Sequence, residues 1–113
     1  MQPNIKDCNQ LQSILRNIEK IERYKRKFGA SYCNFKDDAD YQDLCYYALV
    51  QIGEAVHSLS NEFVEMSAEI DWESIYGMRC YLVHGYDSIN SNIIWNVIDS
   101  DILQLKKFCE MYV

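Results

Sequence analysis

Residues 41–59 read YQDLCYYALVQIGEAVHSL, and this stretch decides the fold class. Its apolar residues recur at steps of three and four positions, which is the spacing of one face of an α-helix. The stripe consists of Tyr41, Leu44, Cys45, Ala48, Ile52, Ala55 and Leu59. Gly53 is costly inside a helix, so we expect a neighbouring helix to cross close to it.

Further helices are expected on both sides of this stretch. The same spacing of apolar residues recurs over residues 8–28, 61–70, 72–86 and 91–108. No stretch alternates convincingly with a period of two, which excludes a β-rich fold. Together with residues 41–59, these segments predict five helices, four of them long enough to pack side by side.

Helix ends are also marked in the sequence. Asp7 and Asp71 are expected to cap the first and fourth helices, and Gly29 is expected to end the first one. The segment after Gly29 is expected to be a connection that Tyr32 and Phe35 anchor in the core.

Composition limits the architecture to one small domain. The chain has 113 residues, 49% of them hydrophobic, with one proline and four glycines. Long helices form easily in such a chain, and short connections favour neighbours that run in opposite directions. We therefore predict an all-α fold over residues 1–113, an up-and-down antiparallel bundle of four to five helices.

Charge is unevenly spread along the chain. The net charge is −6, which taken alone argues against binding to nucleic acid. Six of the eleven basic residues nevertheless fall within residues 16–27. The candidates for RNA contact are Arg16, Lys20, Arg23, Arg26 and Lys27. The alternative is a solvated helix face balanced by Glu19 and Glu22.

The five cysteines form no CxxC pair, which fits neither a disulfide framework nor a zinc site. Several occupy apolar helical positions, where a reduced thiol packs as a small hydrophobic group. We expect a reducing, cytoplasmic setting, no metal and no cofactor. The N-terminus lacks a signal-peptide pattern, and the apolar runs are too short to span a membrane.

Residues 79–86, RCYLVHGY, carry the candidate chemistry at the end of the fourth helix. Arginine binds phosphate with a two-pronged guanidinium, and histidine transfers protons near neutral pH. The alternative is structural: His84 caps the helix, Arg79 pairs with Glu73 or Asp87, and Tyr86 lies in the core. Spacing alone leaves both interpretations open.

RNA cleavage is the reaction that such a pair could catalyse. His84 would take the proton from a ribose 2′-hydroxyl, which attacks the adjacent phosphorus, while Arg79 stabilises the charge on the phosphoryl oxygens. A second acid must protonate the leaving oxygen, and a two-fold dimer would supply it. His57 is a further candidate acid or base, or else an ordinary exposed histidine.

Several blocks of the sequence resemble one known family. Arg79-x-x-x-x-His84-x-Tyr86 resembles the RX4HXY signature of HepT-type proteins in the HEPN superfamily. Residues 52–56, IGEAV, resemble a segment of the family's second helix, and residues 72–79 resemble its W-x-x-I-x-G-M-R run. The blocks have the family's order and spacing.

The resemblance implies a homodimeric helical bundle with the motif at the dimer cleft. It implies a metal-independent endoribonuclease, the toxin of a type VII-like toxin–antitoxin system. The implied antitoxin is a minimal nucleotidyltransferase (MNT) protein, which in the family can transfer AMP to the motif tyrosine, Tyr86 here. Catalytic roles are implied for Arg79 and His84.

A second function remains open at this point: a non-catalytic helical partner of a nucleotidyltransferase. Two features favour it, the net charge of −6 and Cys80, which follows Arg79 where the superfamily commonly has a polar residue. Gly85 stands where the family often has an aspartate. The intact Arg79, His84 and Tyr86 favour the enzyme.

Overall fold

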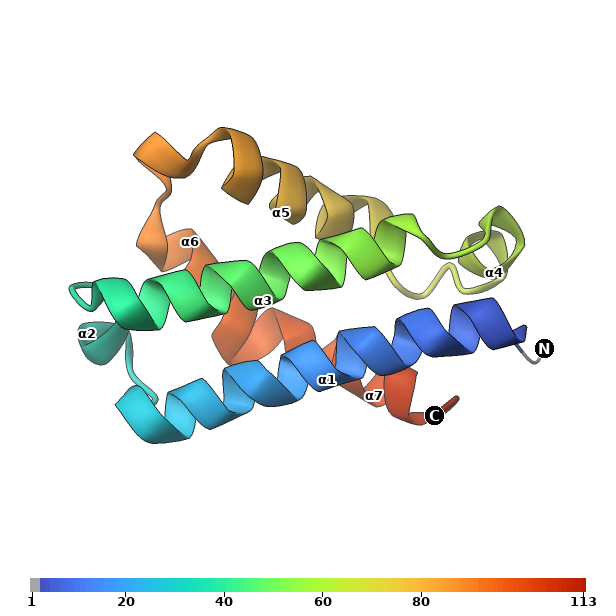
Figure 1. The fold of residues 1–113 in the computed structure, drawn as a ribbon, viewed down its shortest axis with the longest axis horizontal. Coiled ribbons are helices and arrows are strands. Elements are labelled where there is room, and N and C mark those ends of the chain that lie inside the picture. Colours follow the sequence, from blue (N-terminus) through green and yellow to red (C-terminus); the bar gives the residue numbers. More distant parts are fainter. Residues whose placement is uncertain (1–2) are drawn as a thin grey trace.

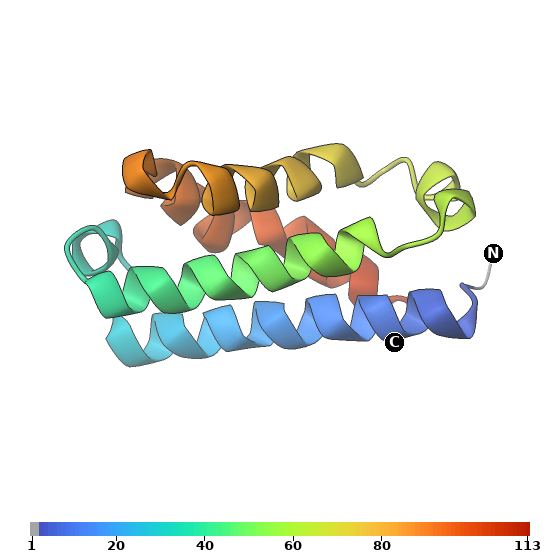
Figure 2. The ribbon, with the colours of Figure 1, turned by 45° about the horizontal axis from the view of Figure 1, so that its top comes forward.

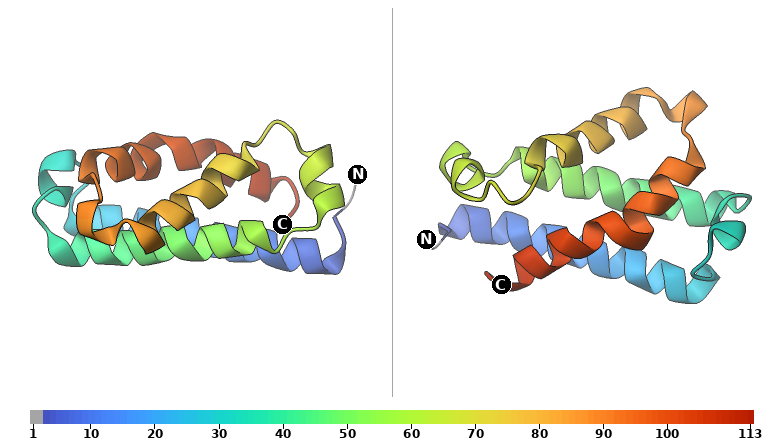
Figure 3. Two further views of the ribbon diagram at one scale, coloured as in Figure 1. Left: turned by 90° about the horizontal axis from the view of Figure 1, so that it is seen from above. Right: turned by 180° about the vertical axis from the view of Figure 1, so that it is seen from behind.

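Helix α3 (Ala39–His57) lies in the middle of the molecule, between α1 (Ile5–Phe28) and α5 (Trp72–His84) (Figure 1). Both α1 and α5 pack against α3, and Figure 2 shows α1 and α3 side by side. The C-terminal run of helix crosses behind them (Figure 3). The computed structural model describes residues 3–113, except for the side chain of Tyr86.

Shorter elements complete the described chain. They are α2 (Tyr32–Phe35), α4 (Asn61–Met66), the 3-10 turn η1 (Tyr86–Ser88), α6 (Ser91–Asn96), the π-helical η2 (Val97–Asp101) and α7 (Ile102–Glu110). Because α6, η2 and α7 are continuous, residues 3–113 contain six helical segments besides the short 3-10 turn η1, and no strand. The all-α class is confirmed, and the expected number of four to five helices is wrong.

The additional segment is α2, which lies where a connection was expected. The hydroxyl of Ser31 accepts a hydrogen bond from the backbone N–H of Asn34, and this cap starts the helix. Phe35 at its end is fully buried, so the expected aromatic anchor is confirmed. One turn of helix is too short to give a periodic pattern, which is why the sequence did not reveal it.

The first helix begins earlier than expected. Asn4, not Asp7, caps α1: its side-chain oxygen accepts a hydrogen bond of 2.7 Å from the backbone N–H of Asp7. Asp7 is only 1% exposed, and its carboxylate accepts hydrogen bonds from the backbone N–H and the hydroxyl of Ser60, at 2.8 and 2.7 Å. The carboxylate therefore ties the start of α1 to the start of α4.

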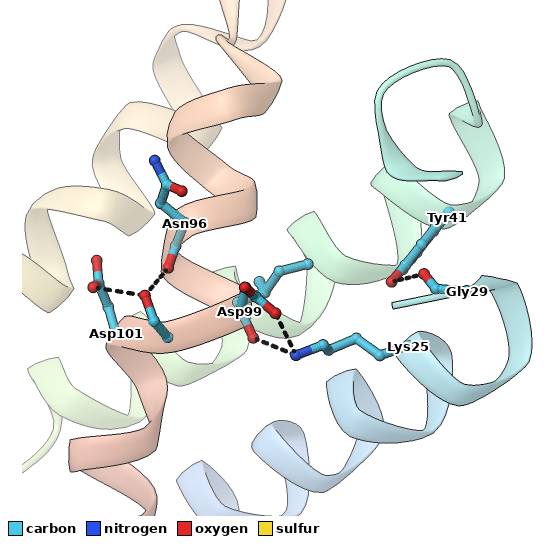
Figure 4. Close-up of polar contacts among 8 residues, drawn as sticks. Lys25, Gly29, Tyr41, Asn96, Asp99 and Asp101 are labelled. Carbon is cyan, nitrogen blue, oxygen red and sulfur yellow. Dashed lines mark hydrogen bonds and ion pairs between the residues drawn. The ribbon is translucent and has the colours of Figure 1, made fainter. Parts of the chain in front are cut away.

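Gly29 ends α1, as expected. Its backbone N–H donates to the carbonyl of Lys25 at 3.0 Å, and its φ of 107° is a conformation that glycine adopts without strain. The buried hydroxyl of Tyr41 donates to the Gly29 carbonyl at 3.0 Å (Figure 4). This bond joins the end of α1 to the start of α3.

The third expected helix is shorter in the structure, since α4 ends at Met66. The next residue, Ser67, is buried and donates its hydroxyl proton to the carbonyl of Phe63 at 2.6 Å. The indole N–H of Trp72 donates to the Ser67 hydroxyl at 3.0 Å. Asp71 then caps α5, as expected.

The C-terminal run carries a π-helical turn that the apolar spacing did not predict. At this turn Lys25 reaches across from α1: its Nζ donates to a carboxylate oxygen of Asp99 at 3.1 Å and to the carbonyl of Ile98 at 3.5 Å (Figure 4). The same ammonium lies 5.7 Å from the ring centroid of Trp95. These contacts hold the run against α1.

The core forms where the apolar faces of the long helices meet, as the sequence pattern indicated. Its buried members include Leu11, Ile14, Ile18, Ile52, Ile98 and Leu105. Across residues 3–113, none of the helices has the length and apolar character needed to span a membrane.

Candidate functional site

The site begins where α5 crosses α3. A side-chain Cβ at Gly53 would overlap the Cβ of Arg79 and lie 2.9 Å from its Cγ and 3.5 Å from its Cα. Only glycine therefore allows the two helices to approach this closely. The expected close crossing at Gly53 is confirmed, and it fixes the position of the Arg79 Cβ.

Arg79 forms an ion pair with Glu54, the residue that follows Gly53 on α3. The Arg79 Nε donates to a carboxylate oxygen of Glu54, and this bond raises the pKa of the guanidinium above its usual value. The structural alternative had paired Arg79 with Glu73 or Asp87, and that pairing is wrong. The Arg79 side chain remains 24% exposed and that of Glu54 47% exposed, so the pair lies at the surface.

The guanidinium keeps donors for another group. Within the described residues, its Nε binds Glu54, and its Cζ lies 5.7 Å from the ring centroid of Tyr76. Apart from a hydrogen bond between the guanidinium and the Cys80 side chain, the terminal amino groups make no hydrogen bond to a described residue. A carboxylate on Nε, and terminal nitrogens that no described carboxylate binds, suit a guanidinium that binds phosphate.

His84 is the last residue of α5 and is exposed. The backbone N–H of Gly85 donates to the Tyr81 carbonyl at 2.9 Å and closes the final turn. A Cβ at Gly85 would lie 2.9 Å from that carbonyl oxygen, so glycine suits the tight exit from the helix. Asn90 then donates its backbone N–H to the Tyr81 hydroxyl at 2.8 Å, which holds the following segment.

Arg79 and His84 share α5 but do not touch. Five residues separate them, which is about 7.5 Å along the helix axis and about 140° around it. The backbone of Tyr86 starts η1, directly after the helix, while its side chain lies outside the described part of the structure. One chain thus presents the arginine in the middle of α5, at its crossing with α3, and the histidine at the exposed end of the helix.

His57 and Tyr76 form a ring pair beside Arg79. The imidazole of His57, in the last turn of α3, stacks on the Tyr76 ring with centroids 4.6 Å apart and an angle of 16° between the planes. His57 is exposed and Tyr76 partly buried. An exposed histidine was one of the two interpretations of His57, and its contact with the arginine-bound tyrosine was not foreseen.

The expected RNA-contacting residues lie on α1, away from the arginine. Arg16, Arg23, Arg26 and Lys27 are exposed, and Lys20 is partly buried. Helix α3 lies between α1 and α5, so this surface and Arg79 belong to different parts of the molecule. The neighbouring Glu22 does not balance these charges, because it binds Lys106 of α7 at 2.8 Å.

The cysteines are free thiols, and two of them belong to the core. Burial raises the pKa of Cys45 and Cys109 to about 12, so both stay protonated and pack as apolar groups. Cys80 is partly exposed next to Arg79. Among the described side chains, no three His, Cys, Asp or Glu residues come together as ligands for a metal ion.

Comparison with known proteins is consistent with this arrangement. Residues 14–112 match the family model described as "Ribonuclease HepT-like". A protein of Caldanaerobacter subterraneus subsp. tengcongensis, named "Putative RNase", is 39% identical over 86% of this chain and 85% of its own length. A Thermococcus cleftensis protein, named "Probable ribonuclease HepT", is 32% identical over 85% of this chain and 86% of its own. No solved structure matches the chain significantly.

Proposed function

This chain belongs to the HepT-like ribonuclease family, and from that premise we propose that it is a metal-independent endoribonuclease that acts as a toxin. The observation that carries the proposal is the placement of Arg79. Gly53 and Glu54 fix the arginine on the surface of α5, where no described carboxylate binds its terminal nitrogens, and His84 lies farther along the same helix.

The reaction follows from the two side chains. His84 accepts the proton of a ribose 2′-hydroxyl, and the resulting oxygen attacks the neighbouring phosphorus. The bond from phosphorus to the 5′-oxygen breaks, which leaves a 2′,3′-cyclic phosphate and a 5′-hydroxyl. Arg79 stabilises the charge that builds up on the phosphoryl oxygens. The nucleophile belongs to the substrate, so no metal-bound water is required.

A second copy of the chain completes the site in this proposal. The leaving 5′-oxygen needs a proton, and a single chain offers one histidine at the end of α5. A two-fold dimer would bring two copies of Arg79 and His84 into one cleft. Exposed apolar side chains support self-association through α3 and α5, with Tyr47 64% exposed and Leu44 and Val83 also exposed.

Expression without any partner tests this function. We expect the wild-type protein to stop growth and degrade cellular RNA, and we expect His84→Ala to do neither, because proton transfer is lost. Growth curves and RNA integrity are the measurements, with soluble, dimeric protein of both forms as the control. Unchanged growth and intact RNA with folded, dimeric wild type would contradict the toxin and favour a non-catalytic partner of a nucleotidyltransferase.

Tyr86 is the proposed point of control by an MNT nucleotidyltransferase antitoxin. Its phenol would attack the α-phosphate of ATP and release pyrophosphate, which leaves AMP on the tyrosine. A bulky anion at this position, two residues after His84, would occupy Arg79 and block RNA.

Mass spectrometry tests this modification. Incubation with ATP, magnesium and a cognate MNT nucleotidyltransferase should add one AMP to the wild type, with loss of RNA cleavage. Tyr86→Phe should gain no mass and stay active, since it lacks only the phenolic oxygen. Equal modification of both proteins would show that Tyr86 is not the acceptor.

A further inference from the structure

Two residue pairs lie along the interface between α3 and α5. Glu54 pairs with Arg79, and one turn away His57 stacks on Tyr76. Because the helices run in opposite directions, each step toward the end of α3 is a step toward the start of α5. The two rings therefore lie on one side of Arg79, and His84 lies on the other.

This ring pair is more exposed than the aromatic contacts of the core. Phe35 and Tyr41 pack edge to face and are fully buried. The His57 and Tyr76 rings lie nearly parallel, as do those of Phe28 and Tyr41, but His57 is exposed. Within the described residues, no hydrogen bond is formed by the imidazole or by the Tyr76 hydroxyl.

We propose that His57 and Tyr76 form a stacking site for one nucleobase of single-stranded RNA. Flat aromatic and imidazole rings bind unstacked bases in this way, because every base offers a π-face. Arg79 lies three residues after Tyr76, about 4.5 Å along the helix axis. A base on the rings would thus place its own backbone phosphate near the guanidinium.

The proposed site deepens the ribonuclease function and rests on it. It assigns the substrate class, since a base can reach the rings only when it is unpaired and unstacked. It also sets the orientation of the bound strand: one base lies on the rings, and proton transfer takes place on the other side of Arg79, at His84. Here His57 is a binding residue that positions the strand, rather than a second acid.

Two substitutions of His57 separate stacking from acid–base chemistry. His57→Phe keeps a flat ring and removes the ionisable nitrogens, whereas His57→Asn keeps a polar group and removes the ring. The His57 side chain is exposed, and thermal unfolding confirms that each variant folds. The probe is a short single-stranded oligoribonucleotide with one 2-aminopurine, bound by proteins that also carry His84→Ala, so that it is not cleaved.

Quenching of 2-aminopurine fluorescence reports stacking, and titration gives the dissociation constant. We expect His57→Asn to weaken binding about 5- to 100-fold and to relieve the quenching. His57→Phe should keep both, and Tyr76→Leu should behave like His57→Asn. Equal binding by His57→Asn and its parent would overturn the stacking site, as would equal losses in the Phe and Asn variants.

A cleavage assay of the same proteins with His84 intact, run beside the binding titration, distinguishes this inference from the proposed function. If the wild type cleaves RNA and His57→Asn binds and cleaves RNA equally well, the stacking site is contradicted and the ribonuclease function is supported. If the fluorescence quenching depends on His57 but the wild type cleaves no RNA, the stacking site is supported and the ribonuclease function is contradicted.

Discussion

Arg79→Ala is expected to lower the kcat of RNA cleavage about 10²- to 10³-fold, the usual effect of removing one donor to a developing negative charge. The guanidinium is the fixed cation on this part of α5, and no described carboxylate binds its terminal nitrogens. Steady-state cleavage of a fluorescent oligoribonucleotide measures the loss. Wild-type kcat in a folded Arg79→Ala protein would contradict the assignment.

Two companion variants show whether the loss belongs to the site. Glu54→Ala should lower kcat about tenfold, because the Arg79 guanidinium remains but loses the ion pair that orients it. Arg23→Ala on α1 serves as the matched arginine control. This substitution removes one exposed positive charge far from α5. It should therefore raise the KM for RNA and leave kcat unchanged.

Gly53→Ala is expected to destabilise the fold by about 1–3 kcal/mol, the usual effect of forcing extra volume into a packed interface. The added methyl group would overlap the Cβ of Arg79, which belongs to a helix and cannot swing away. The helices must therefore separate, and Arg79 moves with α5. We expect RNA cleavage to fall as well, under conditions where the variant is still folded.

Gly77→Ala is the matched control for this prediction. Apart from its chain neighbours and the backbone of its own helix, no described atom lies within 4 Å of a Cβ built at Gly77, so alanine fits and raises helix propensity. The expected change is a stabilisation of about 0.5–1 kcal/mol. Urea unfolding of both variants measures the two effects, and equal stability of Gly53→Ala and wild type would show that the crossing does not require glycine.

The sequence predicted what belongs to a single helix. Apolar spacing located α3 and the other long helices, and Gly29 and Asp71 marked helix ends correctly. Gly53 was predicted to face a close neighbour because a glycine in a helix needs such a reason. The cap of α1 was assigned to Asp7, and only tertiary packing shows that Asp7 turns inward while Asn4 caps the helix.

Contacts between helices could not be predicted in the same way. The partners of Arg79 depend on the register of α5 against α3, which the pattern within either helix does not fix. Glu54 and Tyr76 were therefore missed, although Glu54 lies in the IGEAV block directly after Gly53. That position was the available signal, since a residue next to a crossing glycine lies beside the crossing helix.

The chemistry of the cut tests the central claim most directly. Purified protein is incubated in EDTA with an oligoribonucleotide, and with the same strand carrying one 2′-deoxyribose at the cleaved position. We predict cleavage of the all-ribose strand to a 2′,3′-cyclic phosphate and a 5′-hydroxyl, and no cleavage at the deoxyribose. A folded protein that leaves the ribose strand intact, or cuts both strands equally, would contradict a ribonuclease built on Arg79 and His84.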